Sequence, residues 1–222
     1  MERDTTTRLT FTGSASNAVW TADGRHLVFR TTSGASGFSW IRSDGAGEPQ
    51  LLLESPENVV PWDYSPDGKR LAYFQINPET GFDLWTLPVD TSDPEHPKPG
   101  QPEPFLRTAA DELLPRFSPD GRWIAYRSTQ SGTPEIYVRP FPAGSGGKWL
   151  ISTNGGLYAI WSRDGRELFY ETADNRIMVV DYTVKGDTFI PGKPRLWSEN
   201  QIFYTGTSKL DLAPGRVARS GR

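Results

Sequence analysis

The sequence predicts an all-β protein, a β-propeller built from four-stranded blades. The first indication is a short motif that recurs four times: an aromatic residue, Thr or Ser, one further residue and the pair Asp-Gly. The second is an apolar, strand-like run after each copy. The third is the spacing, which gives a repeat of roughly 40 to 55 residues. The copies are Trp20–Gly24, Tyr64–Gly68, Phe117–Gly121 and Trp161–Gly165.

Each motif predicts a tight turn between two antiparallel strands. In two copies Pro66 and Pro119 fix φ before the Asp, and the glycine takes the left-handed conformation that a side chain resists. The expected structural turn residues are Asp23, Gly24, Asp67, Gly68, Asp120, Gly121, Asp164 and Gly165. The aromatic residue that opens each motif is expected to end the first strand and to pack between neighbouring blades. These aromatic residues are Trp20, Tyr64, Phe117 and Trp161.

The apolar run after each turn is the expected second strand of its blade, and two further strand-like stretches complete the four. The second strands are expected at 27–29, 71–74, 123–126 and 168–170. The third strands are expected at 38–42, 82–87, 135–139 and 177–182, and the fourth at 50–53, 103–106, 148–151 and 195–197. The repeats are then approximately 14–56, 57–108, 109–154 and 155–200. The second repeat is longer because residues 91–104 are Pro-rich, which predicts an exposed, stiff loop without regular strand pairing.

Both ends of the chain carry pieces of further blades. Residues 7–11 look like a stray outer strand of a preceding or split blade, and residues 209–219 look like the degenerate start of a further blade. We therefore expect one partial propeller over residues 1–222, with about four blades plus a partial or split fifth. Such a chain is expected to be part of a larger propeller, because an open arc leaves two blade faces without a neighbour.

Composition argues against several classes of protein. The formal net charge is −3 and the basic residues form no stripe, so nucleic acid is not an expected partner. The absence of cysteine excludes disulfides, thiolate catalysis and cysteine-based zinc sites. No apolar run is long enough to span a bilayer, so we expect no membrane insertion by this chain. Residues 1–10 are polar and charged, so no signal peptide is visible in this stretch.

The search for catalytic groups finds none. The two histidines have no triad partner: His26 is expected to face solvent, and His96 lies in the Pro-rich stretch. The sequence contains no Gly-x-Ser-x-Gly nucleophile elbow, no phosphate-binding loop and no kinase signature. We therefore expect no catalytic residue, no cofactor and no metal site in this chain. A structural calcium ion at one of the Asp-Gly turns stays open as an alternative.

Binding residues are predicted at the mouth of the propeller channel, where the loops of the inner strands line a concave surface. The candidates that precede inner strands are Asn58, Asp111, Glu112, Asn154 and Tyr158. Two further candidates, Asp63 and Arg116, stand where other repeats have an apolar residue in the inner strand. They either serve a ligand or pair with each other across adjacent blades. A protein or peptide is the expected partner.

The repeats resemble the TolB-type, WD-repeat-like β-propeller repeat of bacteria. The resemblance rests on the pattern Trp/Tyr/Phe-Ser-Pro-Asp-Gly-Arg/Lys-x-Ile/Leu-Ala-Tyr/Phe followed by a third strand such as residues 135–138, and it extends from about residue 9 to residue 218. Residues 134–182 are most similar to the C-terminal propeller of bacterial eukaryotic-like serine/threonine protein kinases. The stretches that carry this second similarity are 137–142, 147–149 and 161–170.

The resemblance implies a non-catalytic platform that binds a protein, peptide or glycan as the sensor or interaction module of a larger bacterial protein, such as a kinase. It also favours an extracytoplasmic or periplasmic location. Two alternatives stay open. In the first, the chain is the gating propeller of a prolyl-oligopeptidase-type hydrolase. In the second, it is a periplasmic TolB-like envelope protein.

Overall fold

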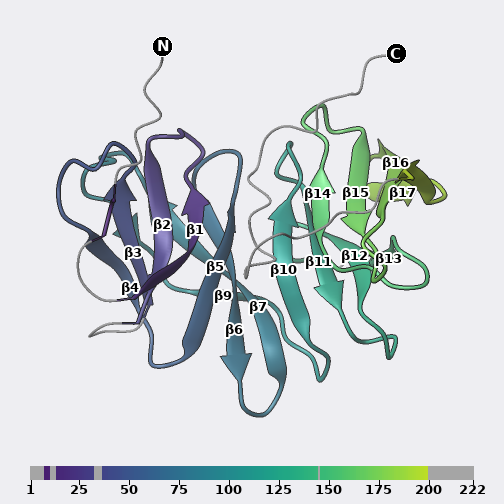
Figure 1. Ribbon diagram of the computed structural model, residues 1–222, viewed down its shortest axis with the longest axis horizontal. Coiled ribbons are helices and arrows are strands. Elements are labelled where there is room, and N and C mark those ends of the chain that lie inside the picture. The colour runs from purple at the N-terminus through teal and green to yellow at the C-terminus, as the bar shows by residue number, and fades with distance from the viewer. Residues whose placement is uncertain (1–7, 11–13, 33–36, 145, 200–222) are drawn as a thin grey trace.

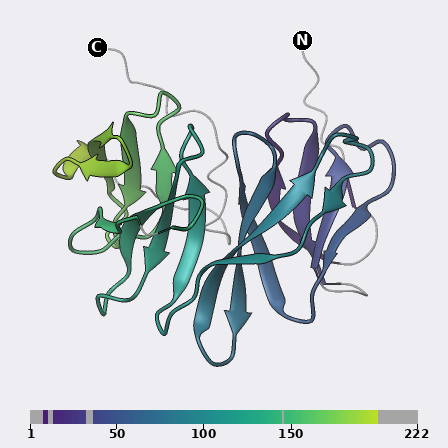
Figure 2. The same cartoon turned by 180° about the vertical axis from the view of Figure 1, so that it is seen from behind.

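The computed structural model describes residues 8–10, 14–32, 37–144 and 146–199. These residues form antiparallel strands in four sheets, which follow one another across the molecule in chain order (Figures 1 and 2). No helix occurs in this part of the chain. The predicted all-β class is therefore confirmed. Each sheet is built from one of the four repeats, and the sheets are called blade 1 to blade 4 below.

The first strands of neighbouring blades contact one another, so they form the inner side of the arc. Blade 1 contains β1 (Ala15–Trp20), β2 (His26–Thr31), β3 (Gly37–Arg42) and β4 (Gln50–Glu54). Blade 2 contains β5 (Asn58–Tyr64), β6 (Arg70–Asn77), β7 (Gly81–Asp90), β8 (Lys98–Pro99) and β9 (Glu103–Leu106). Blade 3 contains β10 (Glu112–Phe117), β11 (Trp123–Ser128), β12 (Glu135–Pro140) and β13 (Trp149–Leu150). Blade 4 contains β14 (Ala159–Trp161), β15 (Glu167–Glu171), β16 (Ile177–Lys185), β17 (Thr188–Pro191) and β18 (Arg195–Ser198).

Two blades carry a strand that the repeat pattern does not predict. In blade 2, β7 continues to Asp90, and its last two residues pair with β8. The expectation that the Pro-rich stretch has no strand pairing is therefore wrong at Lys98–Pro99. A proline is tolerated there because β8 is a two-residue edge strand that does not need every amide. In blade 4, β16 is extended in the same way and pairs with β17.

The four Asp-Gly turns form as predicted. Their glycines have φ values of 65° to 71°, in the left-handed region that favours glycine: Gly24, Gly68, Gly121 and Gly165. In the second copy the Ser65 hydroxyl donates to the Asp67 carboxylate (2.6 Å), and the Gly68 amide donates to the Ser65 carbonyl (2.9 Å). The same hydroxyl–carboxylate bond recurs in the other three copies. Each turn is thus closed by its own side chains.

Apolar side chains fill the three spaces between neighbouring blades. The middle strand β6 shows how one sheet serves two of these spaces. Leu71 and Tyr73 pack toward blade 1, whereas Ala72 and Phe74 pack toward blade 3. This alternation follows from the two-residue period of a β-strand. It explains why the second strands read as continuous apolar runs.

Three of the four motif aromatics pack between blades as predicted. Tyr64, Phe117 and Trp161 are 7%, 6% and 9% exposed. The indole Nε1 of Trp161 donates to the Arg116 carbonyl of the preceding blade (3.0 Å). The prediction is wrong for Trp20, whose side chain is 46% exposed. These rings pack on the preceding blade, and the described part of the chain has no blade before blade 1.

The chain in front of β1 covers part of the free face of blade 1. Leu9 packs against the small apolar cluster on that face. Residues 8–10 form no strand, so the outer strand expected over residues 7–11 is not seen in these three residues. The rest of that stretch lies outside the described residues, as does the further blade start expected over residues 209–219.

We expect Gly68→Val to lower the free energy of unfolding by about 1–2 kcal/mol, because valine is forced into a left-handed conformation. The nearest atom to an added Cβ is the Ala22 Cβ at 3.6 Å, so the loss reports on the backbone and not on a clash. Urea denaturation measures the change. Gly144→Ala is the control, because Gly144 has a different backbone conformation and room for a Cβ; its effect should stay below about 0.5 kcal/mol. An unchanged unfolding free energy in Gly68→Val would contradict the assigned turn.

Candidate functional site

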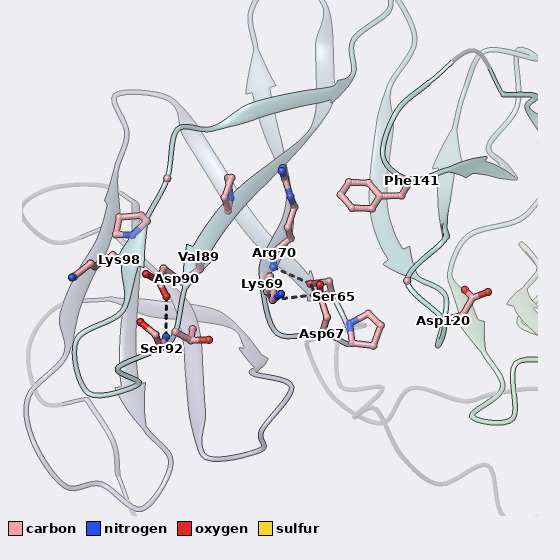
Figure 3. A pocket seen from close by; sticks show the side chains of 16 residues that line it. Ser65, Asp67, Lys69, Arg70, Val89, Asp90, Ser92, Lys98, Asp120 and Phe141 are labelled. Carbon is pink, nitrogen blue, oxygen red and sulfur yellow. Dashed lines mark hydrogen bonds between the residues drawn. The ribbon is translucent and has the colours of Figure 1, made fainter.

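A groove with a volume of about 970 Å³ lies between blades 2 and 3, at the end of the molecule that carries the Asp-Gly turns (Figure 3). It is lined by the turn after β5, by the extension of β7 together with β8, and by the turn after β10 with the residue that follows β12. We call it the turn-face groove. Its most prominent side chains are Asp67, Lys69, Arg70, Asp90, Lys98 and Phe141.

The β7–β8 ribbon forms one wall of the turn-face groove. Val89 is paired with Pro99 across the ribbon, and the Gly100 amide donates to the Pro88 carbonyl (2.8 Å). Because β7 continues beyond its blade, this wall presents a strip formed by Pro88 and Pro99 to the groove, whereas Val89 is 2% exposed and packs between blades 1 and 2. The strip is apolar and its backbone is held by strand pairing.

Phe141 forms the opposite wall. Its ring contacts Phe117 edge-on, with the ring centroids 5.0 Å apart. The guanidinium carbon of Arg70 lies 5.7 Å from the centroid of the Phe141 ring, a cation–π contact, and Figure 3 shows the two side chains facing each other. Arg70 also forms an ion pair with Glu103 in its own blade. Arg70 thus links the two blades inside the groove.

Both signs of charge line the turn-face groove. The exposed charged residues are Lys69, Lys98, Asp67, Asp90 and Asp120. Hydrogen bonds from Ser92 lower the pKa of the Asp90 carboxyl. Burial alone would raise the pKa of Asp67, but hydrogen bonds from Ser65 and the following backbone bring it below its ordinary value. These two carboxylates are therefore ionised at neutral pH beside the lysines.

The inner strands of blades 2 and 3 are joined by Asp63 and Arg116, two of the predicted binding residues. A guanidinium nitrogen of Arg116 lies 3.3 Å from the Asp63 carboxylate, and the Phe117 amide donates to the same carboxylate (2.7 Å). Burial raises the pKa of Asp63, and the Arg116 charge and the Phe117 amide oppose this rise. The guanidinium also stacks over the Trp62 ring at 5.5 Å, and a cavity of about 180 Å³ lies beside the pair. The structure thus joins the two side chains across the blades, and their role toward a ligand stays a prediction.

Three other predicted residues lie at the starts of the inner strands, away from the Asp-Gly turns. The Asp111 carboxylate accepts a hydrogen bond from the Phe82 amide of blade 2 (3.3 Å). Glu112 is 1% exposed and accepts from the Thr108 hydroxyl (2.6 Å). Burial raises the pKa values of both Glu112 and Tyr158. Glu112 is therefore directed into the protein, whereas Asp111 and Tyr158 are partly accessible.

Arg127 is the residue that the sequence reasoning missed at this end. Burial lowers the pKa of Arg127, and its electrostatic interactions with the Tyr158 hydroxyl and the Asp111 carboxylate oppose that effect. The structure therefore brings a cation close to two predicted residues from different blades; an arginine within the apolar run of β11 was the signal in the sequence. Asn58 and Asn154 are both exposed, and Asn154 has a φ of 74°, which asparagine tolerates. A binding role for these channel-mouth residues stays a prediction.

The expectation that His26 faces solvent is wrong. Its side chain is 3% exposed and its ring is stacked on Trp40, with the ring centroids 4.8 Å apart. Nε2 lies 3.9 Å from a carboxylate oxygen of Glu95, which belongs to the Pro-rich stretch. The Pro-rich stretch folds back over blade 1 and covers His26. Because this contact joins distant parts of the chain, the local sequence around His26 does not predict its burial. His96 in the same stretch is 76% exposed.

The described residues contain no group of three or more His, Cys, Asp or Glu side chains that is arranged to hold a metal ion. The aspartates of the four turns belong to four different blades, and each accepts a hydrogen bond from the hydroxyl of its own turn. Among the same residues, no helix has the length and apolar character needed to cross a membrane.

Comparison with known proteins gives sequence relatives that match parts of the chain. No protein-family model matches it. Over 105 residues it is 30% identical to the uncharacterized protein Atu1656 of Agrobacterium fabrum, which covers 47% of this chain and 32% of that protein. Over 90 residues it is 32% identical to the Tol-Pal system protein TolB of Xylella fastidiosa, which covers 40% of this chain and 19% of that protein. The chain thus spans no more than about a third of the length of these curated relatives.

Solved structures share the architecture. The putative TolB from Agrobacterium tumefaciens matches with a TM-score of 0.61 and 19% identity, over 82% of this chain and 66% of that chain. A puromycin-hydrolyzing peptidase from Mycobacterium tuberculosis matches with a TM-score of 0.57 and 17% identity, over 79% of this chain and 30% of that chain. Likeness at this level of identity shows the fold. The chain is therefore a β-propeller, and its sequence is similar to part of TolB.

We expect Glu112→Gln to gain stability relative to the unchanged chain as the pH rises. Burial raises the pKa of Glu112, so the folded chain holds this proton more tightly than the unfolded chain does. The stability that the carboxyl contributes is present below its ordinary value of 4.5 and is lost as the pH rises through the raised value. Urea unfolding of both proteins at about pH 4 and about pH 7 measures this change. The same difference in unfolding free energy at both pH values would show that burial does not shift this group.

Proposed function

We propose that this chain is a non-catalytic propeller platform that binds a protein partner through an extended peptide segment in the turn-face groove. The observation that carries the proposal is the groove itself, about 970 Å³ in volume between two blades, with a proline-lined wall, an aromatic wall and charges of both signs. Its walls are fixed by strand pairing in one blade and by ring packing in the other. Pre-formed grooves of this kind are typical binding sites.

The chemistry of the groove favours a peptide over a phosphate-bearing ligand. Its two exposed lysines are balanced by three exposed aspartates, so it has no excess of positive charge to attract phosphates. A peptide offers apolar side chains for the proline strip and Phe141, and charged side chains of either sign for the rims. A glycan would use the same ring and carboxylates, and competition with a bound peptide separates the two ligands.

We further propose that the platform belongs to a larger bacterial protein on the extracytoplasmic side. The TolB relative from Xylella fastidiosa is a Tol-Pal system protein, and the TolB-like fold supports a related role in protein binding. The resemblance of residues 134–182 to the propellers of bacterial serine/threonine kinases supports a kinase sensor module as the parent. The platform then acts by presenting its groove while another domain carries the catalysis.

A second candidate is the gating propeller of a peptidase. The likeness to the puromycin-hydrolyzing peptidase from Mycobacterium tuberculosis favours it. The sequence contains no nucleophile elbow, so the catalytic groups of such a hydrolase would lie in another domain. An adjoining coding region with a Gly-x-Ser-x-Gly domain would support this candidate, and one with a kinase domain would support the sensor module.

Selection of short random peptides on the intact chain tests the platform. Phe141→Ala is expected to weaken the selected peptides about tenfold or more, because loss of an aromatic anchor costs about 1.4 kcal/mol or more. Lys98→Glu, an exposed change on the opposite wall, tests the same groove without touching the core. Leu150→Ala is the control, because Leu150 is 48% exposed and lies outside the groove. Binding that survives both groove substitutions would contradict the proposal.

The channel mouth is tested in the same assay. Asp111→Ala and Tyr158→Ala remove two accessible side chains at that end, and Glu112→Ala removes the third candidate of this group. We expect peptide binding to be unchanged in Asp111→Ala and Tyr158→Ala, because neither residue lines the turn-face groove. Loss of binding in these variants, with the groove variants unaffected, would move the site to the channel mouth.

A further inference from the structure

Residues 91–97 join β7 to β8 and fold back across the outer part of blade 1; we call them the strap. The Trp40 indole Nε1 donates to the Pro94 carbonyl (3.1 Å), and an Arg42 guanidinium nitrogen lies 2.8 Å from the Glu95 carboxylate. The residues of blade 1 that bind the strap are Trp40, Arg42 and Gln50. The strap is therefore held by blade 1, although both of its ends belong to blade 2.

The two ends of the strap form a wall of the turn-face groove. Asp90 and Lys98 are paired across the ribbon, directly before and after the strap. The Ser92 amide donates to the Asp90 carboxylate (2.9 Å), and all three residues line the groove on the side opposite Phe141 (Figure 3). The same short segment thus contacts blade 1 on one side and shapes the groove on the other. Strand pairing joins β8 to β7, and the strap adds a second attachment of this wall, to blade 1.

His26 lies beneath the strap. Its side chain is 3% exposed and its ring is stacked on Trp40. Nδ1 lies 3.4 Å from a carboxylate oxygen of Asp23, and Nε2 lies 3.9 Å from one of Glu95. Among the described residues, neither ring nitrogen has a hydrogen-bond partner. The imidazole is therefore buried between a carboxylate of its own turn and a carboxylate of the strap.

We propose that protonation of His26 clamps the strap onto blade 1 and so sets the width of the turn-face groove; its effect on ligand binding rests on the proposed function. The imidazolium donates from Nδ1 toward Asp23 and from Nε2 toward Glu95, and it thus joins the β1–β2 turn to the strap. A neutral imidazole has only one N–H, so one of these contacts is lost. Histidine changes its charge between about pH 5 and pH 8, so the clamp engages on acidification.

Two carboxylates and one guanidinium lie around the His26 ring. Asp23 faces it from the turn and Glu95 from the strap, while Arg42 at the end of β3 opposes them. The Arg42 charge is balanced by its ion pair with Asp44. Burial alone would raise the pKa of Asp23, but hydrogen bonds within its turn bring it below its ordinary value, so Asp23 stays ionised. The added attraction is present while His26 carries its proton and is lost as the pH rises and the proton leaves.

An NMR titration of the intact chain tests the clamp without a ligand. The chain has two histidines, and the exposed His96 serves as an internal reference. We expect the Trp40 indole N–H and the Glu95 amide signals to shift with the same midpoint as the His26 ring signals. These shifts are lost in His26→Gln and retained in His96→Gln. Shifts that follow the midpoint of His96, or that persist in His26→Gln, would overturn the proposal.

The groove width is measured with spin labels, because the chain has no cysteine of its own. A label at Ser92→Cys lies on one wall of the groove, and a label at Pro119→Cys lies next to Asp120, which lines the other side. Other repeats carry Ala or Arg at the position of Pro119. We expect the distance between the labels to change between about pH 5 and pH 8, and to stay constant when Glu95→Gln is added. A constant distance in both proteins would overturn the proposal. A pH-dependent distance without any peptide binding would support the clamp and contradict the proposed function.

Discussion

The packing of each blade on the one before it is the contact on which the rest of this structure depends. A four-stranded sheet has two apolar faces, and alternation along a strand such as β6 directs successive side chains to opposite neighbours. The inner strands fix the register of this packing. The Phe117 amide binds the Asp63 carboxylate of the preceding blade, and the Trp161 indole binds the Arg116 carbonyl. Where no preceding blade is described, the corresponding ring of Trp20 is exposed.

The same packing creates the candidate site. The turn-face groove exists because the turns of blades 2 and 3 lie side by side and because β7 extends beyond its sheet. Arg70 spans the gap, with its charge paired to Glu103 and its guanidinium over the Phe141 ring. A repeat architecture thus produces a rigid scaffold, while a local departure from the repeat produces the groove that we propose as the binding surface. This division agrees with propellers that act as platforms for variable functions.

Local patterns in the sequence predict the parts of the fold that depend on local chemistry. The Asp-Gly turns form because a hydroxyl, a carboxylate and a left-handed glycine lie within five residues of one another. The burial of His26 and the pairing of Lys98 depend on the strap folding back over distant strands, and a local pattern contains no information on such contacts. The exposure of Trp20 reflects the lack of a preceding blade among the described residues, which its own motif does not encode.

The candidate site is less predictable than the fold for the same reason. The polar replacements Asp63 and Arg116 can be recognised because the other repeats supply a reference at that position. Arg127 becomes a candidate site residue only in the folded structure, where it interacts with Tyr158 and Asp111. A local sequence pattern does not show this proximity. The groove has no motif at all, because its walls come from segments of two blades that are distant in sequence.

Amide hydrogen exchange of the inner strands tests most directly the claim that each blade is held by the one before it. The strand β1 is mostly exposed, whereas β5 and β10 are mostly buried under the preceding blade. Local opening is easier where few apolar contacts must break, so we expect the paired amides of β1 to exchange about tenfold faster than those of β5 and β10, or more. Equal protection of β1 and the two covered strands would contradict the account.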